Sequence, residues 1–200
     1  MKSIILASAS PRRRELLSEI EDSFRIVLAE TDETLPSGTH PKDGVGILAI
    51  RKGAAVLEKM RSEGEATDGM IILSADTLVE IDGEPLGKPS DRDEARQMLA
   101  RLSGRWHNVH TGVAVHGDGR VIAEVATTAV LFKELSSSEI EDYIDSGEPM
   151  DKAGSYGIQG LGGRFVERID GDFDTVVGLS MKTTSKLLLE LGWKSVDRGE

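Results

Sequence analysis

The first seventeen residues, MKSIILASASPRRRELL, predict a buried strand that leads directly into a helix. Ile4–Leu6 is a short apolar run, which is typical of a buried strand. Ser10 is a favoured helix N-cap and Pro11 a favoured first helical residue, so we expect a helix over about 11–21. Seryl hydroxyls and the open N–H groups of a helix start therefore meet at the end of the first strand.

Three consecutive arginines, Arg12–Arg14, occupy the first turn of this predicted helix. Cations there oppose the helix dipole, which favours acidic groups at a helix start. Hydroxyls, open N–H groups and guanidinium groups all attract phosphate oxygens. The segment therefore predicts a phosphate-binding site, and a solvated basic face is the alternative interpretation.

The rest of the chain alternates helical and strand patterns. Its 200 residues suit one large domain, or one domain with an additional lobe. Helical patterns cover about 44–62, 90–102, 136–147 and 182–191; strand patterns cover about 24–28, 70–73, 78–86 (a hairpin with an Asp-Gly turn), 105–116, 121–132, 165–169 and 175–177. Because βα units alternate with long hairpins, we expect an α/β fold with a mixed, twisted sheet and flanking helices.

Composition excludes several classes of protein. The 24 basic and 35 acidic residues give a net charge of −11, which argues against general nucleic-acid or acidic-membrane binding. The chain has no cysteine, so disulfide and thiolate chemistry are excluded, and its four histidines alone disfavour a structural zinc site. No run approaches the roughly 20 apolar residues of a membrane span, and the apolar run after Lys2 is too short for a secretory signal. We therefore expect a cytoplasmic protein.

Asp76 follows the apolar run at 71–75, where we expect a strand to end. In open α/β sheets ligands bind outside the carboxyl ends of strands, and a carboxylate there can hold a divalent metal or accept a proton from water. A turn aspartate that caps local backbone is the alternative. Lys88, beside Gly87, could neutralise a phosphate, or it could be an ordinary exposed lysine.

The segment DKAGSYGIQGLGG, residues 151–163, contains five glycines, which permit tight turns and close backbone approach. Gln159 could read a base edge, because its amide both donates and accepts hydrogen bonds. A flexible surface loop is the alternative. Tyr156, Ile158 and Leu161 would be costly to expose together, so we expect a packed and shaped loop.

Taken in order, the segments SASPRRRELL, SADT, LGKP, LSGRWHNVHTGVAV and DKAGSYGIQGLGG resemble the Maf family of nucleoside triphosphate pyrophosphatases. The resemblance extends from about Ile4 to Leu179 and is greatest to the subgroup that acts on dTTP and UTP. It implies a single domain over 1–200 with two lobes around a nucleotide cleft, similar to the inosine-triphosphate pyrophosphatases. Homodimers are usual among such enzymes.

The resemblance also implies roles for individual residues. Asp76 would be the catalytic carboxylate, and Glu33, in TDETLP, would assist with metal or water. Lys52 and Lys88 would be the two phosphate lysines. The substrate-binding residues would be Ser8, Ser10, Arg12, Arg13, Thr77 and Gln159, of which Arg12, Thr77 and Gln159 distinguish the dTTP/UTP subgroup. Gly53 departs from the family, which usually has alanine there, so we expect a slightly weaker helix.

These roles imply hydrolysis between the α and β phosphates with Mg²⁺ or Mn²⁺ held by Asp76 and Glu33. The products would be a nucleoside monophosphate and pyrophosphate, and the reaction would clean the nucleotide pool. Two alternatives remain open: the same chemistry on methylated guanine nucleotides, and a non-enzymatic nucleotide-binding regulator of septum formation. The net charge disfavours a DNA-binding protein.

Overall fold

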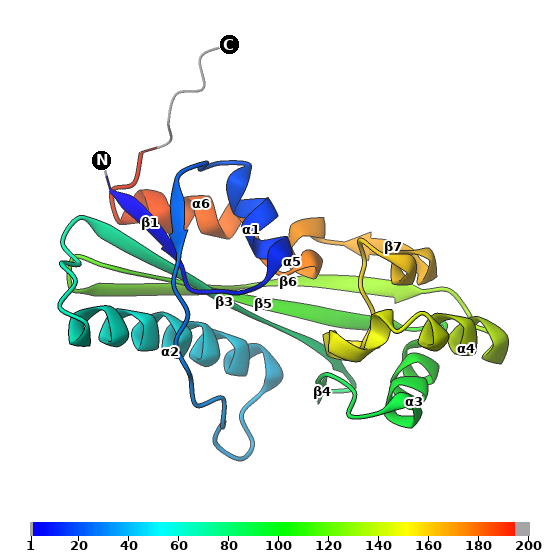
Figure 1. The fold of residues 1–200 in the computed structure, drawn as a ribbon. Helices are drawn as coiled ribbons and strands as arrows, with labels where there is room; N and C mark the ends of the chain where they lie inside the picture. The colour runs from blue at the N-terminus through cyan, green and yellow to red at the C-terminus, as the bar shows by residue number, and fades with distance from the viewer. Residues whose placement is uncertain (1, 195–200) are drawn as a thin grey trace, which may run out of the picture. The chain divides into compact units, whose positions relative to one another are not determined.

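The structure, a computed structural model that describes residues 2–194, is built on a mixed seven-stranded sheet with flanking helices (Figure 1). The strand order is β2-β1-β3-β5-β6-β7, with β4 paired to β3. The strands are β1 Ser3–Leu6, β2 Phe24–Ile26, β3 Met70–Ile81, β4 Glu84–Leu86, β5 Trp106–Gly117, β6 Arg120–Phe132 and β7 Val166–Asp170. β1 is parallel to β2 and β3, whereas β4 and β7 are antiparallel to their neighbours, which confirms the mixed α/β class.

The helices in the described range connect or follow these strands. They are α1 Pro11–Ser18, α2 Pro41–Ser62, α3 Arg92–Leu102, α4 Ser137–Asp145, α5 Phe173–Val177 and α6 Met181–Glu190, with short 3-10 helices η1 Glu148–Asp151, η2 Ala153–Ser155 and η3 Leu161–Phe165. None of them, within residues 2–194, is both long and apolar enough to cross a membrane.

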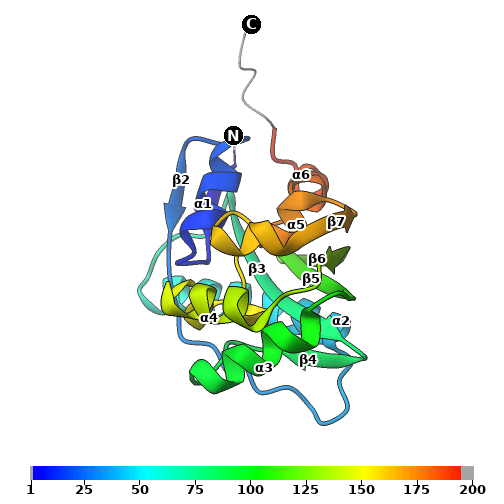
Figure 2. The same cartoon turned by 90° about the vertical axis from the view of Figure 1, so that its right-hand side faces the viewer.

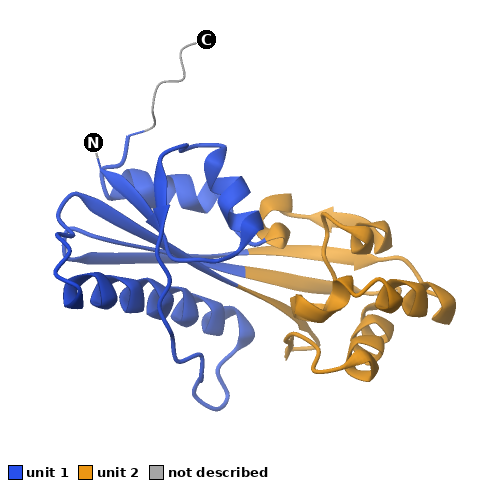
Figure 3. Cartoon of the chain, in the orientation of Figure 1, with its two compact units in different colours: residues 1–76, 111–126, 178–200 blue, residues 77–110, 127–177 orange. Residues whose placement is uncertain are grey.

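The chain divides into two compact units (Figure 3). Unit 1 comprises residues 1–76, 111–126 and 178–200, and unit 2 comprises residues 77–110 and 127–177. The boundaries fall inside β3, β5 and at the middle of β6, so these three strands contribute residues to both units.

In unit 1, helix α2 covers one face of the strands, and α1 and α6 cover the other (Figure 1, Figure 2). Ile5, Ile72, Val56 and Met60 form one buried cluster in which β1 and β3 meet α2. Each fully buried side chain of this kind contributes roughly 2 kcal/mol through the hydrophobic effect. Gly112 lets β5 approach α2, because a Cβ atom there would lie 2.4 Å from the Val45 carbonyl oxygen.

The core of unit 2 is aromatic. Phe132 contacts His107 and Tyr156 edge-on, with ring centroids 4.9 Å and 4.7 Å away, and Phe165 meets Tyr143 in the same way at 5.0 Å. Such edge-to-face pairs add about 1 kcal/mol each beyond the area that they bury. Because β5 and β6 supply two of these rings and α4 and η3 two others, this cluster fixes the segment around Tyr156 against the sheet.

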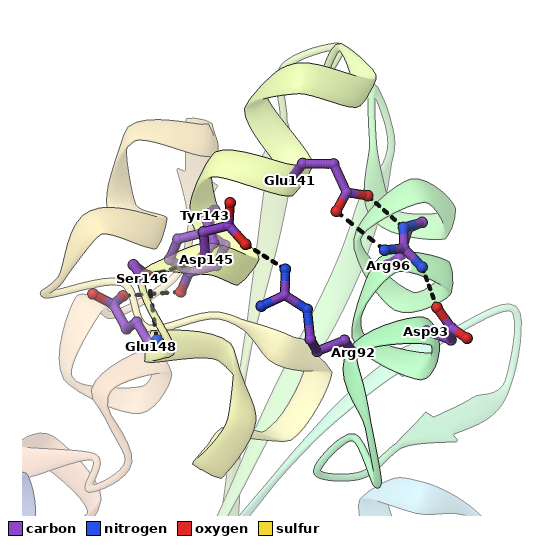
Figure 4. Close-up of polar contacts among 8 residues, drawn as sticks. All are labelled: Arg92, Asp93, Arg96, Glu141, Tyr143, Asp145, Ser146 and Glu148. Carbon is purple, nitrogen blue, oxygen red and sulfur yellow. Dashed lines mark hydrogen bonds and ion pairs between the residues drawn. The ribbon is translucent and has the colours of Figure 1, made fainter.

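Ion pairs join α3 to α4 on the surface of unit 2 (Figure 4). Arg96 binds the Glu141 carboxylate with two nitrogen atoms, and Arg92 pairs with Asp145. Exposed pairs of this kind are worth less than about 1 kcal/mol each. They therefore align the two helices more than they stabilise the unit.

Two predicted elements differ from the observed ones. The segment 175–177 is the end of helix α5 rather than a strand. Its β-branched residues favour a strand, but the Thr175 N–H donates to the Asp172 carbonyl and the turn closes helically, so tertiary context overrides propensity. The helix predicted from about residue 90 begins at Arg92, because the Asp91 carboxylate caps it by accepting from the Glu94 N–H at 2.9 Å.

Candidate active site

The loop between β1 and α1 is organised by two serines and one arginine. Ser10 caps α1 by accepting from the Arg13 N–H at 3.4 Å, as the sequence predicts. The Ser8 hydroxyl oxygen accepts from the Ser10 N–H at 3.2 Å and from Arg13 Nη1 at 3.3 Å. The Arg13 Nε donates to the Gly178 carbonyl at 2.8 Å, so the guanidinium is held at the carboxyl end of β1.

The arginines of this turn differ in their surroundings. Arg12 and Arg13 are half-buried, whereas Arg14 is exposed. Burial lowers the pKa of the Arg13 guanidinium, the Asp76 carboxylate opposes that shift, and the neighbouring Arg12 adds to it. An arginine stays protonated at any ordinary pH. The turn therefore concentrates positive charge, and a bound anion would relieve its mutual repulsion.

Lys52 of helix α2 joins the two carboxylates that the sequence analysis assigns to catalysis. Its Nζ lies 2.6 Å from Asp76 Oδ1 and 2.8 Å from Glu33 Oε1. The side chains of Asp76 and Lys52 are only 14% and 21% exposed, whereas that of Glu33 is 61% exposed. Burial lowers the pKa of the Lys52 ammonium, but the charges of Asp76 and Glu33 outweigh it, so that the pKa is raised.

The position of Asp76 differs from the prediction. β3 does not end at Ala75 but continues to Ile81, so Asp76 lies within a strand of 12 residues. The reason is a change of partner: β3 pairs with β1 only as far as Leu73, opposite Leu6, and its far end pairs with β4. Asp76 therefore lies just beyond the end of β1, although its own strand continues.

A cavity of about 280 Å³ in unit 1 brings together Ser8, Arg13, Glu33 and Lys52, and Asp76 reaches it through its contact with Lys52. It is lined by Ala7, Ser8, Ala9, Arg13, Leu28, Ala29, Thr31, Glu33, Lys52 and Val56. A larger and more open hollow of about 580 Å³ shares Leu28 and Ala29 with it. That hollow is lined by one cation, Lys59, whereas the smaller cavity is lined by two, Arg13 and Lys52.

The two carboxylates also bear on metal binding. Glu33 and Asp76 both lie within 2.8 Å of one ammonium nitrogen, so both can approach a single cation. Within residues 2–194 no group of three or more histidine, aspartate or glutamate side chains is arranged to hold a metal ion. Mg²⁺ in nucleotide enzymes commonly takes one or two carboxylates together with substrate phosphates and water. The pair fits that mode of binding and does not form an all-protein cage.

Three predicted site residues belong to unit 2. Thr77 follows Asp76 in β3 and is half-buried, Lys88 follows β4 and is exposed, and Gln159 is exposed between η2 and η3. That these residues join those of unit 1 in one site stays a prediction. The loop that carries Gln159 is shaped as expected around Tyr156, which is buried, but Leu161 is exposed.

Comparison with known proteins identifies the family. A family model described as "Maf-like protein" matches residues 3–191. The chain belongs to the Maf family. The resemblance inferred from the sequence motifs is thereby confirmed over almost the whole chain.

Relatives of this Maf-family chain carry a common name. A protein of Bacillus cereus (strain G9842) named "dTTP/UTP pyrophosphatase" is 45% identical over 197 residues, which cover 98% of each chain. A protein of the same name from Bacillus velezensis is 47% identical, and the match covers 97% of this chain and 99% of that protein. Another, from Bdellovibrio bacteriovorus, is 45% identical, and the match covers 93% of this chain and 97% of that protein. The solved structure of the Staphylococcus aureus Ham1 protein covers 92% of this chain and 90% of its own at 15% identity and a TM-score of 0.49.

In this Maf-family chain, close packing explains the glycine next to Lys52, although glycine is a poor helix former. Gly53 is buried, and a Cβ atom there would lie 2.4 Å from two atoms of the His116 ring and 2.7 Å from the Ser74 hydroxyl oxygen. The Ser74 hydroxyl is itself fixed, because it donates to the Ala49 carbonyl at 2.7 Å. Gly53 therefore brings α2, and with it Lys52, close to β3 and β5.

The sequence analysis did not single out Glu148, which organises the loop around Gln159. Its carboxylate accepts a hydrogen bond from the Leu161 N–H at 2.9 Å and another from the Gly162 N–H at 3.1 Å. In the sequence, the only sign of this role is that an acidic residue precedes a glycine-rich segment. Such a pattern has no fixed spacing, so it does not identify Glu148.

Proposed function

We propose that this protein hydrolyses dTTP and UTP to the nucleoside monophosphates and pyrophosphate. Relatives that are 45–47% identical over nearly their whole length are named dTTP/UTP pyrophosphatases. The observation that carries the proposal is the contact of Lys52 with both Asp76 and Glu33 beside a cavity that Arg13 also lines. Cations and carboxylates brought together in this way serve both phosphate binding and activation of water.

The groups at the start of α1 are suited to bind the phosphates. Ser8, Ser10 and the open N–H groups of the first helical turn supply hydrogen bonds, and Arg13 supplies a fixed guanidinium charge. A cavity of about 280 Å³ lies at the low end of the roughly 300–1,000 Å³ of small-molecule sites. Its size therefore suits the phosphate chain rather than a whole nucleotide.

Glu33 and Asp76 would hold a divalent cation, Mg²⁺ or Mn²⁺. When bound, such an ion supplies positive charge that polarises the phosphoryl group. Water and phosphate oxygens would complete its coordination, because the protein offers two carboxylates here. The net charge of −11 makes this neutralisation more necessary for an anionic substrate.

Asp76 would orient the attacking water and accept its proton. It is enclosed, and the Lys52 ammonium 2.6 Å from Oδ1 fixes the direction of the carboxylate, as a base that acts on a positioned water requires. As the water attacks the α phosphorus, the bond to the bridging oxygen breaks and pyrophosphate leaves. Arg13, Lys52 and Lys88 would stabilise the charge that grows on that leaving group.

Base selection is assigned to Arg12, Thr77 and Gln159. The Gln159 amide can both donate to and accept from the edge of a pyrimidine. A single domain of two lobes, a cytoplasmic location and homodimerisation also remain predictions.

The direct test is pyrophosphate release from a panel of dTTP, UTP, CTP, GTP and methylated guanine triphosphates with Mg²⁺ or Mn²⁺. We expect fast release from dTTP and UTP that is lost in Asp76→Asn. Activity confined to methylated guanine nucleotides would keep the reaction and overturn the specificity. Binding of nucleotides without any release would instead favour a regulator.

A further inference from the structure

The carboxylate of Glu148 lies inside the glycine-rich loop of unit 2. Oε1 accepts from the Tyr143 hydroxyl at 2.9 Å (Figure 4). The same oxygen accepts from the Gly162 N–H at 3.1 Å. Oε2 accepts from the Leu161 N–H at 2.9 Å. One side chain thus satisfies two backbone donors on the C-terminal side of Gln159.

Tyr143 does the same on the N-terminal side of Gln159. Its phenol oxygen accepts from the Gly157 N–H at 3.2 Å while its own proton is donated to Glu148. The Tyr143 side chain is fully buried and rests edge-on against Phe165, so this oxygen has a fixed position. Glu148 and Tyr143 together therefore anchor both ends of the segment 158–160.

The glycines of the loop make room for these two side chains. A Cβ atom at Gly160 would lie 2.5 Å from both carboxylate oxygens of Glu148, and one at Gly162 would lie 2.6 Å from the Tyr143 hydroxyl oxygen. The Gly160 N–H closes a turn onto the Gly157 carbonyl at 3.2 Å. The backbone is thus wrapped around a carboxylate at contact distance, and the loop is a built structure rather than a flexible connection.

Gln159 projects from this fixed backbone with its amide uncommitted. The residue is exposed, and no side-chain hydrogen bond ties its amide to the described residues of unit 2. Because the loop backbone is already ordered, a ligand that binds Gln159 has to order only the side chain, and such preorganisation of the backbone raises affinity. The loop therefore has the properties of a recognition element.

We infer that Glu148 is a positioning residue: by fixing the loop backbone, it places Gln159 where its side-chain amide can form hydrogen bonds with the edge of a pyrimidine base. This inference rests on the proposed function, because it gives Gln159 a base to read. Within residues 2–194 the Glu148 carboxylate accepts hydrogen bonds from the Tyr143 hydroxyl and from the N–H groups of Leu161 and Gly162, so we expect it to act on the substrate through Gln159.

The charge of the side chain matters as well as its shape. A carboxylate offers acceptors at both oxygens, whereas glutamine offers one acceptor and one NH₂ donor. In Glu148→Gln a donor would face either the Leu161 N–H or the Gly162 N–H and the Tyr143 hydroxyl, and one end of the loop would be released. Glu148→Gln is therefore a nearly isosteric change that removes the anchoring function.

The first measurement is hydrogen–deuterium exchange of the segment 157–163 in the nucleotide-free protein. We expect exchange of the Leu161 and Gly162 amides to be faster in Glu148→Gln than in the wild type. A matched control is Glu141→Gln on helix α4 of the same unit, which breaks the pair with Arg96 of α3 and leaves the loop bonds intact. Equal protection in wild type and Glu148→Gln would overturn the inference whether or not the protein proves to be an enzyme.

The second measurement compares kcat/KM for UTP and GTP. We expect Glu148→Gln to lower the preference for UTP about tenfold, mainly through a higher KM for UTP, as expected when one oriented hydrogen bond is lost. Gln159→Ala should have the same effect, and the double variant should lose no more than either single one. An equal loss for both nucleotides, or additive losses, would show a merely structural role. Failure of the wild type to release pyrophosphate would overturn the proposed function separately.

Discussion

The ammonium nitrogen of Lys52 lies 2.6 Å from Asp76 Oδ1, which joins the middle of helix α2 to the middle of strand β3. The two residues are 24 positions apart, and only the packing of α2 on the sheet brings them together. Because Glu33 reaches the same nitrogen at 2.8 Å, two carboxylates converge on a single positive charge. Glu33 and Asp76 therefore form a site in unit 1 that attracts cations.

Replacement of Asp76 by asparagine should abolish turnover and spare the fold. Asparagine keeps an oxygen that can accept from Lys52, but it cannot accept a proton from water. We expect pyrophosphate release from UTP to fall at least about 100-fold, the lower range for loss of a general base, with a nearly unchanged unfolding midpoint in urea. Asp68→Asn, an exposed change in the same unit, is the control. Turnover retained with saturating Mn²⁺ would remove Asp76 from the mechanism.

Lys52→Gln should bind Mn²⁺ more tightly in the absence of nucleotide, although it should be a poorer enzyme. The variant removes the ammonium group that contacts both Glu33 and Asp76. A metal ion then no longer competes with that ammonium group for the two carboxylates. We expect an affinity gain of at least about fivefold, which is modest for two charges in contact near a protein surface. The measurement is titration of free Mn²⁺ by electron paramagnetic resonance.

The control for that experiment is Lys59→Gln on the same helix. The Lys59 ammonium donates to the Leu28 carbonyl and forms no ion pair with a carboxylate of residues 2–194, so its loss should leave Mn²⁺ affinity unchanged. Weaker or equal Mn²⁺ binding by Lys52→Gln would mean that Glu33 and Asp76 do not form the metal site.

Features that depend on neighbouring residues were predictable from the sequence. The Ser10 cap and the Asp82-Gly83 turn are both present, because each depends on residues within four positions of one another. Arg12, Asp76 and Gln159 were likewise singled out from residue type and local context. The family resemblance was needed for Glu33 and Lys52, since neither stands out on a loop or an amphipathic helix.

Features that depend on distant partners were not predictable. The continuity of β3 follows from a change of strand partner after Leu73, which leaves no mark in the local pattern. The role of Glu148 follows from backbone donors that lie 13 and 14 residues later in the chain. The close contact of Gly53 with His116 joins residues 63 positions apart, so the sequence alone suggested only a weakened helix.

Gly53→Ala should destabilise the protein, although alanine is the better helix former. The added methyl group would lie 2.4 Å from the His116 ring, and overpacking of a core costs about 1–3 kcal/mol, which exceeds the roughly 1 kcal/mol gained in helix propensity. We expect a lower free energy of unfolding in urea. In a His116→Ala background the contact with the ring is absent and only the contact with the Ser74 hydroxyl oxygen at 2.7 Å remains, so the same change should cost less stability than in the wild type. An equal effect in both backgrounds would exclude this contact as the cause.

The stability of unit 2 should fall in mild acid because of His107. Burial lowers the pKa of this imidazole from its usual 6.5 to about 4, while its Nε2 lies 2.9 Å from the Tyr156 hydroxyl oxygen. The unfolded chain therefore binds the proton first, and stability that is present above pH 6.5 is lost progressively as the pH falls toward 4. The loss amounts to about 3 kcal/mol for a shift of this size.

Urea unfolding of wild type and His107→Gln between pH 7 and pH 4 isolates this contribution, because all other groups titrate in both proteins. We expect the wild type to lose more stability than the variant over that range, and parallel curves would show that His107 does not remain neutral in the folded protein.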